Sequence, residues 1–157
     1  MHFSEPVTTL TDFLLGAASL YFAVSLLRAR PPQRLSRRLW SIGFLASAIA
    51  AFIGGTYHAL KLDVDVSVLR SLWNVTIFLI GSSGAFMISG VLASSIGRHD
   101  DSRKWLLRGV WVTLAGFLIQ QSGMQLTYFN HNDFFHLVQI GALYLFLRGA
   151  RLLEDAP

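Results

Sequence analysis

The sequence predicts an all-α membrane protein, built as a single bundle of five transmembrane helices over residues 1–157. Hydrophobic residues make up 53% of the 157 and charged residues only 14%, with a mean hydropathy of +0.49. This composition is unusual for a soluble globular domain. Five segments are apolar over the roughly 20 residues that a bilayer crossing needs. Basic residues lie mainly between these segments.

The five spans follow one another with short connections and no visible repeat. They are expected at 8–27, 39–60, 68–96, 105–128 and 133–153. The second and third spans contain small residues, which let membrane helices approach closely. These are Ala46, Ala50, Gly54, Gly81 and Ala85. We therefore expect spans two and three to pack tightly.

The basic residues predict the orientation. All of the 13 Lys and Arg except Lys61 and Arg70 lie on alternate connections or at the end of the fifth span. They are Arg28, Arg30, Arg34, Arg37, Arg38, Arg98, Arg103, Lys104, Arg108, Arg148 and Arg151. Because Lys and Arg favour the cytoplasmic side, the N-terminus is expected outside and the C-terminus inside. The preference for Arg over Lys is typical of a GC-rich bacterial genome, which suggests the bacterial inner membrane.

Charge and cysteine content exclude several functions. The net charge of +4 comes from loops between apolar runs and gives no face for nucleic acid. The chain has no cysteine, which excludes disulfides, thiolate metal sites and cysteine nucleophiles.

Polar residues gather in the outer halves of the predicted spans, whereas the inner halves are mainly apolar. An unpaired polar group in hydrocarbon costs several kcal/mol, so these residues are expected to face each other across an extracytoplasmic pocket. On the fifth span, helical spacing places Asn132, His136 and Gln139 on one face. The expected pocket residues are Asp12, Asn74, Gln121, Gln125, Asn132 and Gln139.

Three histidines lie at the same predicted side and suggest zinc. Catalytic zinc takes three protein ligands from His, Asp or Glu and leaves one position for water. His58, His136 and His131 are the expected ligands, with Asp133 and Asp63 as catalytic carboxylates. For the third ligand, Asp133 or His131 is favoured over Asp12. Alternatively, these side chains only cap a helix or lie among lipid headgroups.

A histidine ending the second span, and Phe134-Phe135-His136 opening the last, resemble the CREST superfamily of membrane metal-dependent hydrolases. That superfamily includes alkaline ceramidases and the adiponectin/progestin receptors. The resemblance implies zinc ligands at His58 and His136. The chain departs from the family pattern in three ways. Gly54 stands where the family has Ser, with Thr56 the nearest hydroxyl. Asn132 stands four residues before His136, where the family has His, and there are five predicted spans rather than seven.

The resulting functional hypothesis is a zinc-dependent hydrolase of a lipid amide or ester, with membrane lipid as its partner. The sequence also allows the protein to form a homo-oligomer. The alternative is a non-catalytic membrane protein that binds a lipid-like or small polar ligand, or haem between His58 and His136. A transporter is disfavoured, because the inner halves are apolar and no inverted repeat is visible.

Overall fold

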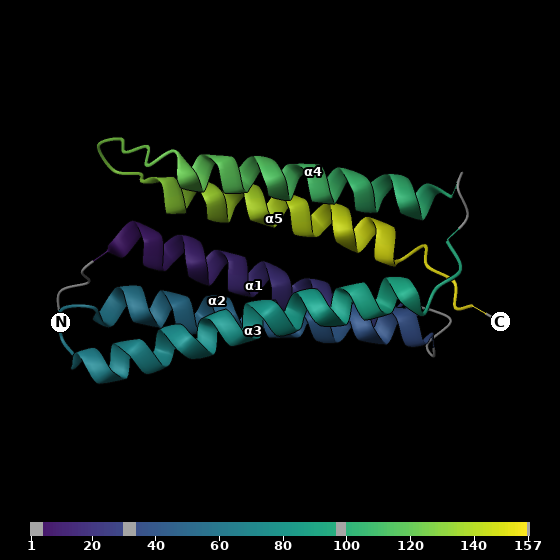
Figure 1. Ribbon diagram of the computed structural model, residues 1–157, viewed down its shortest axis with the longest axis horizontal. Helices are drawn as coiled ribbons and strands as arrows, with labels where there is room; N and C mark the ends of the chain where they lie inside the picture. The colour runs from purple at the N-terminus through teal and green to yellow at the C-terminus, as the bar shows by residue number, and fades with distance from the viewer. Residues whose placement is uncertain (1–4, 30–33, 97–99, 157) are drawn as a thin grey trace.

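The computed structural model describes residues 5–29, 34–96 and 100–156, so Arg30 and Arg98 lie outside the described residues. The described chain is all-helical, with only two isolated bridges, Ser94 to Asp155 and Gln125 to Asn130. Its helices are α1 (Pro6–Leu27), α2 (Leu35–Leu60), α3 (Val66–Leu92), α4 (Asp101–Gln121) and α5 (His131–Ala150) (Figure 1).

Three of these helices are long and apolar enough to cross a membrane. They are α1, α2 and α3, with 22, 26 and 27 residues and hydropathies of 1.7, 1.6 and 1.9. Helices α4 and α5 contain 21 and 20 residues but include more polar side chains. Asp101, Arg103, Lys104 and Arg108 lie in the first turns of α4, and Asn132, Asp133 and His136 open α5.

Every helix begins two to four residues before its expected span, and α3, α4 and α5 end three to seven residues earlier than expected. Local backbone chemistry explains two of these differences. Helix α4 ends at Gln121 rather than near 128, and Gly123 then adopts φ +64°, a left-handed conformation that glycine allows. Helix α5 begins at His131 because Asn130 caps it. The Asn130 side chain accepts hydrogen bonds from the N–H groups of Asn132 and Asp133. Asp133 in turn accepts from the Asn130 N–H at 2.7 Å, which completes a capping box.

The helices form a curved row in the order α3, α2, α1, α5, α4 (Figure 1). Helix α1 packs on α2 and α5, α3 packs on α2, and α4 packs on α5. Within the described ranges, no packing contact joins α3 to α4. The row therefore leaves a groove between its two outer helices. The apolar core lies toward the end where α1 finishes, around Phe22, Leu26, Phe44 and Leu147.

Glycines allow close helix contacts, though not where the sequence suggested. A Cβ added at Gly90 of α3 would lie 2.5 Å from Trp40 of α2. One added at Gly109 of α4 would lie 2.5 Å from Phe146 of α5. The prediction for Gly81 was wrong, because no described side chain lies within 4 Å of its Cβ position. A Cβ added at Gly54 would lie 3.6 Å from the carboxylate oxygens of Asp12 on α1. The neighbour of Gly54 is therefore α1 rather than α3.

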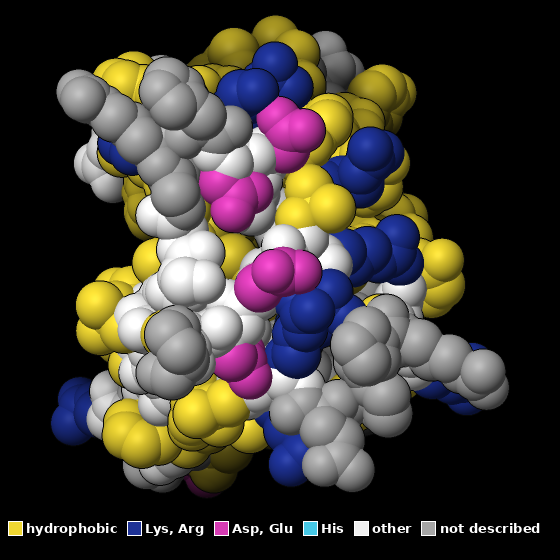
Figure 2. Space-filling model, turned by 90° about the vertical axis from the view of Figure 1, so that its right-hand side faces the viewer, with side chains coloured by type: hydrophobic (Ala, Val, Ile, Leu, Met, Phe, Trp, Pro, Cys, Tyr) yellow, Lys and Arg dark blue, Asp and Glu magenta, His cyan; other side chains and the backbone are white. Residues whose placement is uncertain are grey.

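The end of the molecule opposite the α2–α3 turn carries a network of charged side chains. Figure 2 shows Lys and Arg beside Asp and Glu on this end. Arg34 donates to the Leu153 carbonyl at 2.8 Å and pairs with Glu154 at 3.1 Å. Arg37 donates to the Arg151 carbonyl at 2.6 Å. These bonds join the start of α2 to the segment after α5.

Candidate functional site

A cavity of about 500 Å³ lies in the groove between α3 and α4, over α1, α2 and α5. Its lining changes character from one end to the other. The end near the α2–α3 turn carries the ionisable side chains Glu5, Asp12, His58, Lys61 and His136. The other end is lined by apolar side chains, among them Leu15, Ile80, Met87, Leu143 and Phe146. A cavity with this division suits an amphiphilic molecule.

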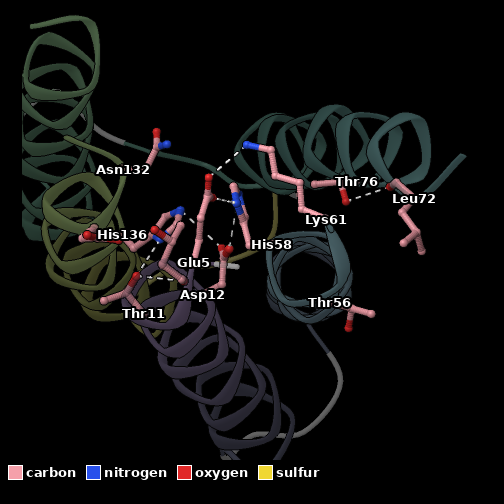
Figure 3. Close-up of polar contacts among 12 residues, drawn as sticks. Glu5, Thr11, Asp12, Thr56, His58, Lys61, Leu72, Thr76, Asn132 and His136 are labelled. Atoms are coloured by element: carbon pink, nitrogen blue, oxygen red, sulfur yellow. Dashed lines mark hydrogen bonds and ion pairs between the residues drawn. The ribbon is translucent and has the colours of Figure 1, made fainter. Parts of the chain in front are cut away.

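Asp12 lies between two histidines at the polar end of the cavity (Figure 3). Its Oδ1 is 3.3 Å from His136 Nε2, and its Oδ2 is 4.0 Å from His58 Nε2. Asp12 is 5% exposed and His136 8%. Three helices, α1, α2 and α5, therefore each contribute one side chain to a single buried cluster.

The outer ring nitrogen of each histidine has its own partner. His136 Nδ1 is 3.0 Å from Thr11 Oγ1. Because the Thr11 hydroxyl donates to the Thr8 carbonyl at 3.0 Å, Thr11 is left to accept a hydrogen bond from His136 Nδ1–H. His58 Nδ1 bonds to Glu5 Oε2. A carboxylate accepts only, so His58 Nδ1 also carries the hydrogen.

Glu5 is held in its ionised form by two donors. Its Oε1 accepts from Lys61 Nζ at 2.9 Å, while Oε2 accepts from His58. Burial raises the pKa of the Glu5 carboxyl, but the hydrogen bonds from Lys61 and His58 outweigh this and hold the pKa below its usual value. Glu5 thus connects the buried cluster to the exposed Lys61 (Figure 3).

These assignments leave an electrostatic conflict around Asp12. A neutral imidazole that carries hydrogen on Nδ1 presents a lone pair at Nε2. Both Nε2 atoms then point lone pairs at a carboxylate, and Asp12 Oδ2 has no hydrogen-bond partner among the described residues. Such an arrangement is stabilised by a proton or a cation placed between the three groups.

The same three groups come close to the geometry of a zinc site without reaching it. In the described ranges, no group of three or more His, Asp or Glu side chains has the spacing to hold a metal ion. Bonds of 2.0–2.1 Å in a tetrahedron place ligand atoms roughly 3.4 Å apart. The distance from Asp12 to His136 already matches this value. The distance of 4.0 Å from Asp12 Oδ2 to His58 Nε2 is too long by roughly 0.6 Å.

The three other residues predicted for the centre have different positions. Asp133 is fully buried and its Oδ2 completes the cap of α5, while its Oδ1 has no hydrogen-bond partner among the described residues. His131 is the first residue of α5 and does not line the cavity. Asp63 lies in the α2–α3 turn, at a separate surface hollow. Asp12, which the sequence placed last among the third ligands, is the carboxylate beside both histidines.

The expected pocket residues divide into two groups. Asp12, Asn132 and Gln139 line the cavity, whereas Asn74, Gln121 and Gln125 are exposed and do not. The lining also contains polar residues that were not among the expected pocket residues, namely Glu5, Lys61, Thr76, Thr113 and Gln120. Gln120 could have been found from its helical spacing, because it is seven residues from Thr113 and so lies on the same face of α4.

Thr56, the hydroxyl residue nearest to the position of the CREST serine, does not belong to the cluster of Asp12, His58 and His136. Thr56 donates to the Phe52 carbonyl at 2.8 Å. It lies on the other side of α2 from Asp12 and His58 (Figure 3).

Comparison with known proteins identifies a family by sequence. A family of unknown function, DUF6962, matches residues 7–118 and 86–155. The chain belongs to this family. Together the two DUF6962 matches cover nearly all of the five helices and include Asp12, His58 and His136. No curated protein and no solved structure matches the chain.

Proposed function

We propose that this protein is a zinc-dependent membrane hydrolase of a lipid amide or ester, with Asp12, His58 and His136 as the metal ligands. One observation carries the proposal. Two imidazole lone pairs and a buried carboxylate converge at the polar end of an otherwise apolar cavity. His58 and His136 are also the residues through which the chain resembles the CREST hydrolases.

The surrounding residues would prepare this centre for a metal. Glu5 and Thr11 hold the two Nδ1–H groups and so direct both Nε2 atoms inward, as outer partners of zinc-binding histidines usually do. Bound zinc polarises a carbonyl group and lowers the pKa of its water to about 7. The apolar lining below the centre would hold the lipid chain and exclude bulk water.

The proposal includes the five-span topology with the N-terminus outside. Helices α4 and α5 have the length to cross a bilayer and pack against each other. The basic residues Arg34, Arg103 and Arg151 lie at the start of α2, the start of α4 and the end of α5. These three helix ends are at the opposite end of the molecule from the α2–α3 turn (Figure 1). By the positive-inside rule, the polar end of the cavity then faces outward, which in a bacterial inner membrane is the periplasm.

A second candidate is a membrane protein that binds an amphiphilic ligand without catalysis. This candidate is favoured by the distance of 4.0 Å between His58 and Asp12. Within the described residues, the three side chains do not have the spacing to hold a metal ion. Haem is disfavoured by the same geometry. The Asp12 carboxylate lies between the two Nε2 atoms, where the iron and porphyrin would have to fit.

The two candidates are separated by metal analysis of protein purified in mild detergent. The hydrolase proposal expects about one zinc per chain, no haem absorbance, and release of fatty acid from added N-acyl or ester lipids. His58→Ala, His136→Ala and Asp12→Asn should each lose the zinc. His131→Ala is the matched control, because His131 lies outside the cluster, and it should retain the metal. Zinc-free protein that carries a tightly bound lipid would overturn the hydrolase and support the binding protein.

A further inference from the structure

A polar stripe continues along the cavity beyond the cluster of Asp12, His58 and His136. On α5, Asn132, His136 and Gln139 are spaced by four and three residues and all line the cavity. On the facing helix α4, Gln120 and Thr113 are seven residues apart and line it too. At the polar end of the cavity, the two helices are joined by a hydrogen bond of 3.3 Å from Gln120 Nε2 to Asn132 Oδ1.

Deeper in the cavity the stripe lacks such a bond. Gln139 Oε1 and Thr113 Oγ1 are both buried, and neither has a hydrogen-bond partner in the described part of the chain. They lie on packed neighbouring helices. In an apolar environment, each unpaired polar atom lowers stability substantially. Neither atom belongs to the Asp12 cluster, so that cluster does not explain them.

We propose that Gln139 and Thr113 form a second polar subsite, which binds a hydroxyl group on the chain of the lipid. A hydroxyl can donate to Gln139 Oε1 and at the same time accept from the Thr113 hydroxyl. The carbonyl and ether oxygens of an ester accept only, and they would leave Gln139 Oε1 unpaired. The proposal rests on the proposed function, because it assumes that the polar head lies at the Asp12 cluster.

The spacing of His136 and Gln139 along α5 indicates which hydroxyl fits. Gln139 is three residues beyond His136 on α5, which is about 4.5 Å along the helix toward the apolar end. A hydroxyl two carbons from the head carbonyl spans a similar distance. The subsite therefore selects lipids that are hydroxylated close to the head over lipids with a plain hydrocarbon chain.

The test uses dodecanohydroxamic acid and its 3-hydroxy derivative as probes, because a hydroxamate head can bind either the zinc or the polar cluster. Binding is measured for the purified full chain in detergent, from the change in tryptophan fluorescence, because one of the four tryptophans, Trp73, lies at the cavity wall. The wild type should bind the 3-hydroxy probe about fivefold to tenfold more tightly, as expected for one or two buried hydrogen bonds. Gln139→Leu and Thr113→Val, which keep approximate size, should lose most of this preference. Both should bind the plain probe at least as well as the wild type.

The outcomes separate the two proposals. Equal binding of both probes by the wild type would overturn the subsite but leave the proposed function standing. A preference that survives in both variants would also overturn it. Failure of both probes to bind would count against the proposed function itself. Stability gives an independent check, because replacing an unpaired buried polar atom should not lower the melting temperature. A clear loss of stability in both variants would show that the two groups are paired within the protein.

Discussion

The carboxylate of Asp155 accepts hydrogen bonds from the backbone N–H of Leu35 at 2.6 Å and of Ser36 at 3.0 Å. A residue beyond α5 thus caps the first turn of α2, some 120 positions earlier in the chain. The residue at the N-cap position, Arg34, has a side chain that cannot accept such bonds.

This cap should make stability depend on pH. Burial raises the pKa of Asp155, but the bonds from Ser36 and Leu35 outweigh it and hold the pKa below its usual value. A carboxyl group whose pKa is lower in the folded state stabilises the fold. This contribution is complete at pH values above the unfolded-state pKa, which is near 4. This stabilisation is lost as the pH falls through the folded-state pKa. We expect Asp155→Ala to lower the free energy of unfolding by about 1 kcal/mol at pH 7. The difference from wild type should shrink below about pH 4.

Thermal unfolding in detergent at several pH values measures this effect. Asp155→Asn keeps an acceptor oxygen and should cost less than Asp155→Ala. Glu154→Ala removes the neighbouring, exposed carboxylate and should change stability by no more than about 0.5 kcal/mol. Equal costs for all three substitutions would show that the cap is not what stabilises this end.

Under the proposed function, Glu5 should act on zinc affinity without touching the metal. Glu5→Gln keeps the shape of the side chain but weakens the hold on His58 Nδ1–H. We expect a loss of roughly 10- to 100-fold in zinc affinity, as for other outer partners of metal-binding histidines. Competition with a chelator measures the affinity. Glu154→Gln is the control, because Glu154 also pairs with a basic side chain, Arg34, but at the opposite end. An unchanged affinity in Glu5→Gln would show that Glu5 does not orient His58.

Two glycines on α3 should respond in opposite ways to the same substitution. Gly90→Ala would place Cβ 2.5 Å from Trp40 and 2.9 Å from the Ser36 carbonyl. It should therefore destabilise the bundle by about 1–3 kcal/mol. Gly81→Ala meets no described atom within 4 Å and should be neutral or stabilising by about 0.5–1 kcal/mol. Melting temperatures in one detergent test the pair, and a larger loss for Gly81→Ala would contradict the packing of α2 on α3.

The proposed orientation can be tested against a background free of thiols, because the chain has no cysteine. Single cysteines at Asp63 and Tyr128 should react from outside the cell with an impermeant maleimide. Cysteines at Arg103 and Leu152 should react only after the membrane is opened. Labelling in the reverse order would invert the orientation and place the cavity's polar end in the cytoplasm. Labelling of 63 and 103 from the same side would show that α3 does not cross.

Hydropathy and spacing predicted the helical class and the positions of the helices well, but they could not determine which face meets the cavity. Adjacent helical residues point about 100° apart. Gln120 therefore lines the cavity while Gln121 is exposed. His131 is five residues from His136, which turns it about 140° away. Asp12 was undervalued because its role depends on α1 packing between α2 and α5, and no local pattern reveals that contact.

The contact between α1 and α5 also has a consequence for biosynthesis. Helices α1, α2 and α3 can pack on their neighbours as soon as each is made, because each contact joins consecutive segments. Asp12 meets His136 only after the last helix has entered the bundle. Until then, the carboxylate has only half of its histidine partners. The ribosome must therefore complete nearly the whole chain before this cluster can form, and a nascent chain that stops after α4 would lack His136, the partner of Asp12 on α5.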